Sequence, residues 1–148
     1  MVSLRHFSRE DCDTIRRNRY PDLSCDETCR MISEWNTLQF GGRYFEMFAV
    51  IYDGDPVGSV SICEHSRSAC EIGPDIFPDQ RGKGFAAAAM ELAIMHVREK
   101  GYRLVIQQIR KDNKASIGLH EKLGFEKLDS AYFNRKGNEV LLYFKLIQ

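Results

Sequence analysis

The sequence predicts a single α/β (α+β) domain in which a mixed sheet is flanked by helices. Its 148 residues are enough for one hydrophobic core. No internal repeat, low-complexity tract or linker divides the chain. A strand-helix-strand unit over residues 69–109 predicts two parallel strands, because such a crossover joins parallel neighbours. The elements expected along the chain follow the order ααβββαβαββ.

Two helices are expected first. Ser24 and Glu27 match a capping box, in which each side chain bonds to the backbone N–H of the other residue. An apolar stripe follows, which predicts a helix over residues 25–37. A weaker start at Ser8 predicts an earlier helix over residues 8–18. The two would form a helical pair.

Three strands are expected next. β-branched and aromatic residues flank Asp53-Gly54-Asp55, and this pattern is typical of a tight hairpin between two antiparallel strands. A third strand is expected over residues 69–77, ending before a proline.

The remaining elements complete the crossover and the sheet. A helix over residues 85–100 would end at Gly101, and the apolar run 103–109 is typical of a central strand. The last three elements are expected to be a helix over 115–123 and strands over 125–133 and 138–146.

Charge, hydropathy and cysteine content argue against several classes of protein: nucleic-acid binding, membrane, secreted and metal-binding. The 21 basic and 21 acidic side chains balance, so the whole surface favours neither nucleic acid nor an anionic membrane. No stretch has the length and apolarity of a signal peptide or membrane span, so we expect a cytoplasmic protein. Five cysteines without C-x-x-C spacing predict free thiols and no metal site. A two-residue turn at Ser66-Arg67 would place Cys63 opposite Cys70.

A basic, glycine-rich turn precedes the crossover helix. The stretch DQRGKGFAAAAM begins at Asp79 and leaves several backbone N–H groups unpaired at the positive end of the helix dipole. Such a turn binds anions. The residues expected to hold a phosphorylated ligand are Arg81, Gly82, Lys83, Gly84, Phe85 and Ala86.

Three kinds of phosphate-binding turn compete for this stretch. A Walker A loop needs a lysine followed by serine or threonine, and no lysine in the turn has that neighbour. A dinucleotide fingerprint needs an acidic residue about 20 positions later, whereas the next strand ends with Gln107 and Gln108. The coenzyme A pyrophosphate loop R-x-x-G-x-A is matched by Arg81, Gly84 and Ala86. A basic glycine turn can also be a plain helix start.

A second motif follows the central strand. The run NKASIGLHEKLGF, from Asn113 to Phe125, has the pattern N-x-x-[AS]-x-x-[LY]-[YH]-x-K-x-G-F. Together with the first loop, in this order and spacing, it resembles the GNAT superfamily of N-acetyltransferases. The run from Ser116 onward is also similar to the branch that acetylates phosphinothricin-like amino acids.

The resemblance implies a strongly twisted GNAT-like sheet and acetyl-coenzyme A as co-substrate, without a metal. The donor would lie where two parallel strands separate. Ile76 and Phe77 match positions that pair with the pantetheine arm, and Asn113 and Ser116 match contacts beside it. The separated strands leave backbone groups unpaired, which an amide-rich ligand can satisfy.

The resemblance also implies two catalytic groups. Glu71 matches the strand position of the general base in some similar enzymes, but it can also simply pair across the hairpin. His120 stands where most relatives have tyrosine. A histidine titrates near pH 6.5 and can act as acid or base, or as a hydrogen-bonded core residue.

The acceptor is expected to be a primary amine of a small molecule or peptide. Residues 18–26 and the hairpin after Cys63 match the variable acceptor walls of similar enzymes, and they name no particular amine. The sequence does not decide between a monomer and a homodimer. The alternative function is a catalytically inactive module that binds acetyl-coenzyme A or coenzyme A as a sensor or interaction protein.

Overall fold

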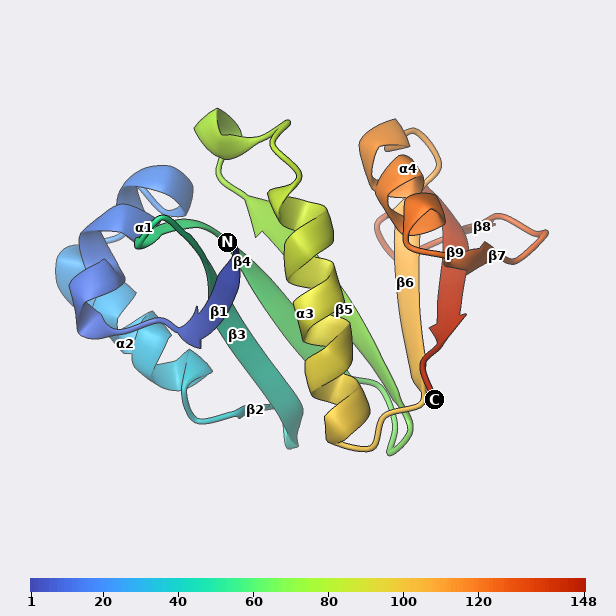
Figure 1. The fold of residues 1–148 in the computed structure, drawn as a ribbon, viewed down its shortest axis with the longest axis horizontal. Helices are drawn as coiled ribbons and strands as arrows, with labels where there is room; N and C mark the ends of the chain where they lie inside the picture. Colours follow the sequence, from blue (N-terminus) through green and yellow to red (C-terminus); the bar gives the residue numbers. More distant parts are fainter.

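The computed structural model describes residues 1–148 as a nine-stranded mixed sheet with helices on both faces (Figure 1). The strands are β1 (Ser3–His6), β2 (Gln39–Phe40), β3 (Arg43–Tyr52), β4 (Asp55–Glu64), β5 (Ala69–Ile76), β6 (Leu104–Arg110), β7 (Glu126–Lys127), β8 (Tyr132–Phe133) and β9 (Glu139–Leu146). The helices are α1 (Cys12–Arg19), α2 (Cys25–Trp35), α3 (Phe85–Glu99) and α4 (Lys114–Lys122), with 3-10 turns η1 (Arg9–Asp11) and η2 (Pro78–Gln80). The strand order is β1-β3-β4-β5-β6-β9-β7, with β2 beside β3 and β8 beside β9.

This architecture confirms the expected fold class. The four α-helices and five long strands follow the predicted order, and the sheet adds two short strands that were not predicted, β1 and β2. The strand expected over 125–133 is divided into β7 and β8, each two residues long. β1 is only four residues long and mostly exposed, and its apolar and polar residues do not alternate regularly. Its sequence therefore does not predict a strand.

Strand β3 separates two hydrophobic cores. Phe48 and Val50 face one side and pack in the cluster that contains the apolar face of α3. Ala49 and Ile51 face the other side and pack with residues of α1 and α2. Because neighbouring side chains on a strand point to opposite faces, the helices cover both faces of the sheet.

The sheet opens between its two parallel strands. β5 and β6 pair only at Ala69–Leu104 and Cys70–Val105, although β5 continues to Ile76. Beyond this point β5 stays paired with β4, and β6 stays paired with β9. The two halves of the sheet therefore diverge beside the start of α3 (Figure 1). This divergence confirms the expected separation of the strands.

The hairpin between β4 and β5 differs from the expected two-residue turn. Its register places Cys63 opposite Glu71 and Cys70 opposite Glu64. A shift of one residue moves a side chain to the other face of a sheet, so Cys63 and Cys70 do not meet. The predicted opposition was therefore wrong.

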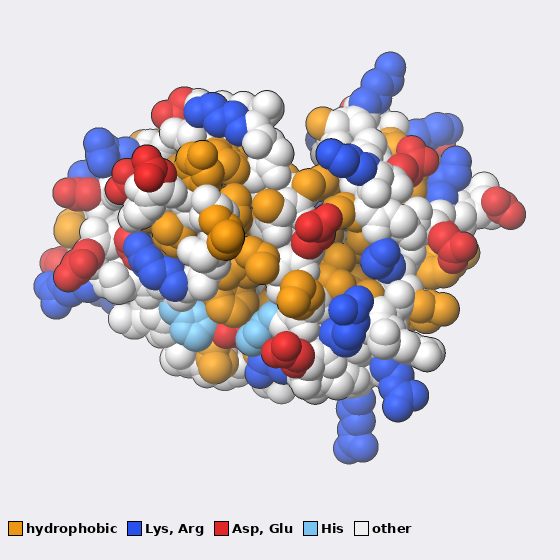
Figure 2. Space-filling model, in the orientation of Figure 1, with side chains coloured by type: hydrophobic (Ala, Val, Ile, Leu, Met, Phe, Trp, Pro, Cys, Tyr) orange, Lys and Arg blue, Asp and Glu red, His pale blue; other side chains and the backbone are white.

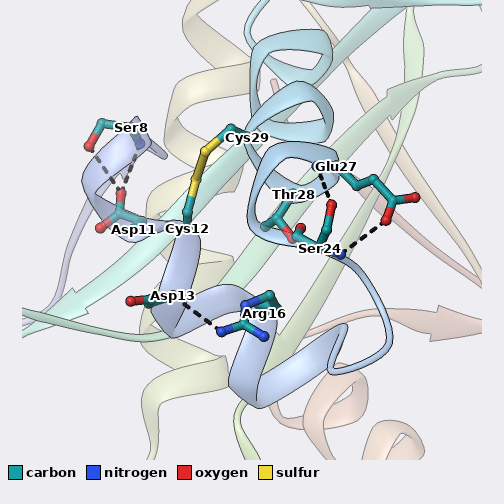
Figure 3. The surroundings of a disulfide bond; sticks show 9 residues. All are labelled: Ser8, Asp11, Cys12, Asp13, Arg16, Ser24, Glu27, Thr28 and Cys29. Atoms are coloured by element: carbon teal, nitrogen blue, oxygen red, sulfur yellow. Dashed lines mark hydrogen bonds and ion pairs between the residues drawn. A yellow bond between two sulfur atoms is a disulfide. The ribbon is translucent and has the colours of Figure 1, made fainter.

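The prediction of five free thiols was also wrong. A disulfide joins Cys12, the first residue of α1, to Cys29 of α2, with 5.8 Å between their Cα atoms (Figure 3). The two cysteines are 17 residues apart and come from different helices, so no short sequence spacing marks them. None of the helices combines the length and apolarity that a membrane crossing requires.

Candidate functional site

A cavity of about 790 Å³ occupies the opening between β5 and β6. Its walls are the end of β5, the turn before α3, the second half of β6 and the inner side of α4. Figure 2 shows the surface hollowed between the lobe that carries this turn and the lobe that carries α4. The volume is in the range of small-molecule and cofactor sites.

The glycine-rich turn leaves the start of α3 open toward the cavity. Gly84 is the N-cap, with a left-handed φ of 83°, and Gly82 has a φ of 78°. No side chain caps the helix, and its first turn holds no acidic residue. A Cβ added at either glycine would meet nothing within 4 Å, so the space above the turn is free. The unpaired N–H groups and the helix dipole therefore offer an anion-binding wall.

Arg81 is fixed across the end of β5. Its Nε donates to the carbonyl oxygen of Ile76 at 3.0 Å, and one Nη lies 4.0 Å from Asp75. Asp75 also pairs with Arg19, at the end of α1, at 2.5 Å. This chain of charges joins the end of the first helix to the glycine-rich turn, and Asp75 and Arg81 line the cavity.

His120 lies buried in the opposite wall, with 1% of its surface exposed. Its Nδ1 lies 2.8 Å from the carbonyl oxygen of Ser116, which can only accept, so Nδ1 carries the proton and donates it. The ring stands edge-on against Phe125, and its Nε2 is buried without a partner. Burial lowers the pKa of His120, and the bond to Ser116 offsets part of that effect. The side chain is therefore a neutral proton acceptor, and His120 is among the residues that line the cavity.

The structure brings most of the predicted site residues together. Those that line the cavity are Ile76, Arg81, Gly82, Gly84, Phe85, Ala86, Asn113, Ser116 and His120. The side-chain oxygen of Asn113 accepts from the backbone N–H of Ser116 at 3.2 Å and so caps α4.

Three predicted site residues lie outside this lining. Phe77 is 2% exposed in the core beside α1 and α2, and its N–H donates to Val57. Lys83 is exposed and donates to Gln80 at 3.1 Å. Glu71 directly follows Cys70, the last residue of β5 that pairs with β6, and its carboxylate lies 2.9 Å from the ring of His65.

Among the residues of the cavity lining that sequence reasoning missed are Asp75 and Gln107. Arg19 and Asp75 come from distant segments, and only the fold brings them together. Gln107 lines the cavity from β6, and its Oε1 is buried without a partner. The sequence contains an indication of this role, because Gln107 and Gln108 interrupt an otherwise apolar central strand. Such an unsatisfied amide is a candidate contact for a polar ligand.

Of the two segments expected to form the acceptor walls, residues 18–26 and the hairpin after Cys63, only the first lies beside the cavity. The end of α1 contacts the cavity wall, because Arg19 pairs with Asp75, a lining residue. The hairpin loop after Cys63 instead lies at the closed end of the sheet, where Ser68 accepts backbone bonds from Arg103 and Leu104.

Sequence comparison identifies the class of this protein. Residues 2–126 match the model of the acetyltransferase (GNAT) domain family. An acetyltransferase of Yersinia pestis is 30% identical over 143 residues, covering 91% of this chain and 95% of that protein. An L-methionine sulfoximine/L-methionine sulfone acetyltransferase of Pseudomonas aeruginosa is 38% identical over 63 residues, 43% of this chain and 37% of that protein.

Solved structures show the same fold at lower identity. An acetyltransferase of Salmonella typhimurium that modifies the N-terminal serine of ribosomal protein L7/L12 has a TM-score of 0.80 and 18% identity, covering 99% of this chain and 95% of its own. Spermidine N-acetyltransferase of Vibrio cholerae, in complex with CoA and spermine, has a TM-score of 0.76 and 19% identity at the same coverage. Fold and relatives define an acyltransferase. The chain belongs to the GNAT family and is an N-acetyltransferase.

Proposed function

We propose that this enzyme transfers an acetyl group from acetyl-coenzyme A to a primary amine by direct attack on the thioester. The observation that carries the proposal is the free Nε2 of His120, a buried proton acceptor in the wall of the cavity. Solved relatives of the same fold hold acetyl-CoA or CoA.

The residues of the opening fit this co-substrate. The uncapped start of α3, with Arg81 beside it, would hold the pyrophosphate. The unpaired edges of β5 and β6, with the unsatisfied Gln107, would bind the amides of the pantetheine arm. When bound, acetyl-coenzyme A supplies an activated acetyl thioester.

His120 moves the proton of the reaction. As the amine nitrogen forms its bond to the acetyl carbon, it loses a proton, and Nε2 accepts it. When the carbon–sulfur bond breaks, the same atom returns this proton to the leaving sulfur. A neutral amine and a thioester thus become an amide and a free thiol. The hydrogen bond from Nδ1 to Ser116 stabilises the imidazolium that forms between the two transfers.

The geometry favours His120 over Glu71 as the base. Glu71 lies outside the cavity lining and is paired with His65.

A panel of amines tests the proposal. The relatives suggest three acceptor classes for the panel: amino-acid analogues such as methionine sulfoximine, polyamines, and peptides with a free N-terminal serine. We expect at least one class to release free thiol from acetyl-coenzyme A, with acetylated amine as the second product. Binding of acetyl-coenzyme A without thiol release from any amine would instead indicate an inactive binding module.

A further inference from the structure

Three cysteines meet where α1 packs beside α2. Cys25 and Cys29 lie four residues apart on α2, and Cys12 begins α1. Their three sulfur atoms all lie within 4.8 Å of one another. Cys12 is buried, Cys29 is half-buried and Cys25 is exposed, so the cluster is built into the helix interface and is open to solvent at one side.

The spacing of the sulfur atoms suits one thiophilic metal ion. A zinc–thiolate bond is about 2.3 Å, so thiolates around one ion lie roughly 3.8–4.0 Å apart in tetrahedral or trigonal geometry. In the oxidised chain the sulfurs of Cys12 and Cys29 are bonded to each other, and the sulfur of Cys25 lies within 4.8 Å of both. After reduction, side-chain rotations would have to separate the first two sulfurs and bring the third closer to reach this spacing. Thiolate ligands select soft cations such as Zn²⁺ and Cu⁺ over Mg²⁺ and Ca²⁺.

Charged groups of both signs surround the cluster. Cys25 is the first residue of α2, at the positive end of the helix dipole, and Asp26 and Glu27 occupy the same turn. Arg16 follows Cys12 by one helical turn on the same face of α1, and its Nε is buried without a partner. Three thiolates around Zn²⁺ or Cu⁺ leave a net negative charge, which the guanidinium of Arg16 would offset in part while it also pairs with Asp13 at 3.4 Å.

We propose that Cys12, Cys25 and Cys29 form a redox-gated binding site for a single thiophilic cation, Zn²⁺ or Cu⁺. The disulfide between Cys12 and Cys29 removes two of the three ligands, so the oxidised chain has no such site. Two equivalents of a thiol reductant convert the disulfide to two cysteine thiols and are themselves joined as a disulfide. Binding of the ion then releases the three thiol protons, as metal binding by cysteine generally requires. The disulfide and the metal ion would each link α1 to α2, and they exclude each other because both use Cys12 and Cys29.

Metal titration of the full-length chain tests this proposal. The protein is reduced, freed of reductant without oxygen, and titrated with Co²⁺ as a spectroscopic probe for Zn²⁺. We expect one equivalent to bind with thiolate-to-cobalt charge-transfer absorption and to be displaced by Zn²⁺. A parallel titration with Cu⁺ against a chromophoric chelator shows which cation binds more tightly. Tight binding of either ion supports the site, and binding of neither overturns it.

Variants identify the ligands. Cys25 is exposed, so Cys25→Ser removes one ligand without disturbing the core, and we expect affinity to fall by at least about 10-fold. Cys63→Ser is the matched control, because Cys63 is a thiol outside the cluster and should leave binding unchanged. Equal affinity of Cys25→Ser and parent would overturn the proposal. So would equal binding by the disulfide-containing chain.

Discussion

His120 shows how one residue's surroundings select its chemistry. The Ser116 carbonyl fixes the proton on Nδ1, and the buried Nε2 keeps a free lone pair. Burial disfavours the charged ring and lowers its pKa. A histidine that could act as acid or base in solution is therefore held in the base form before the reaction starts.

The first prediction concerns the pH dependence of activity. Because the pKa of His120 is lowered, its ionisation should affect kcat/KM below pH 6.5, the ordinary value for histidine, separately from the limb set by protonation of the amine substrate. The unfolded chain binds this proton more readily than the folded chain does. The contribution to stability is therefore complete above about pH 6.5 and declines as the pH falls below it. An acidic limb at or above pH 6.5 that stays in place when amines of different pKa are compared would contradict a buried neutral base.

Substitution of His120 separates its possible roles. His120→Ala should lower kcat by about 10²–10⁴-fold with little change in the affinity for acetyl-coenzyme A. His120→Tyr restores a proton donor but not a neutral base, so it should remain impaired if the proton must first be accepted. Turnover and cofactor binding are measured separately, with Glu71→Gln alongside. A larger loss in Glu71→Gln than in His120→Ala would place the base on β5.

At the scale of elements, Gly58 controls how closely β4 and β5 approach beside the opening. A Cβ at this position would lie 2.6 Å from the carbonyl oxygen of Asp75 and 2.7 Å from the Cα of Ile76. Both are backbone atoms, so one strand would have to move. The residue opposite Gly58 in the register is Ile76, which lines the cavity.

Gly58→Ala should therefore damage both stability and the site. We expect a loss of about 1–3 kcal/mol in unfolding free energy and a raised KM for acetyl-coenzyme A. Gly118→Ala is the matched control, because Gly118 lies inside α4 with no atom within 4 Å of the added Cβ. It should stabilise the chain by roughly 0.5–1 kcal/mol. Denaturant unfolding and initial-rate kinetics measure both effects, and an undisturbed KM in Gly58→Ala would refute the coupling.

Glu46 joins three elements around one buried carboxylate. His6 of β1 lies 2.5 Å from one oxygen, and His96 of α3 lies 2.8 Å from the other. Tyr44, on the same strand as Glu46, also donates to it. Burial alone would raise the pKa of Glu46, but the hydrogen bonds from Tyr44, His6 and His96 outweigh it and hold the pKa below its usual value. The carboxylate thus ties the N-terminal strand to the crossover helix.

This arrangement predicts a stability that depends on pH. Because the pKa of Glu46 is lowered on folding, its contribution is present above pH 4.5 and is lost as the pH falls through the lower folded value. Glu46→Gln should cost about 1–3 kcal/mol near neutral pH and reduce the loss of stability in acid. Urea unfolding at several pH values measures both. Parallel stability curves for parent and variant would contradict the assignment.

At the scale of the whole molecule, short sequence patterns predicted only those features that are formed by neighbouring residues. The capping box of α2, the tight hairpin and the turn before α3 each depend on a few adjacent residues, and the structure contains all three. Contacts between distant segments left no pattern in the sequence. The Cys12–Cys29 disulfide and the Arg19–Asp75 pair depend on how α1 packs, so only the fold reveals them.

The position of Glu71 illustrates a second limit. The sequence places it on the strand that leads into the cavity, which is correct. It does not show where β5 and β6 stop pairing, and this point decides which strand residues reach the opening. Because the strands separate after Cys70, the lining begins at Gly73, and Glu71 stays with the hairpin.

Binding of acetyl-coenzyme A should stabilise the whole fold, because a ligand in the proposed site would bridge the two halves of the sheet. At a concentration of 100 times Kd, binding to the native state contributes about 2.7 kcal/mol, which corresponds to a rise in Tm of roughly 5–11 °C for a chain of this size. Arg81→Ala should reduce this rise, since Arg81 lines the cavity beside the start of α3. Arg135→Ala, which removes the same charge from an exposed turn outside the cavity lining, should leave it unchanged. Thermal unfolding with and without the ligand measures the difference. No rise in the parent would contradict the proposed co-substrate, whereas equal rises in the parent and both variants would place the phosphate contacts elsewhere.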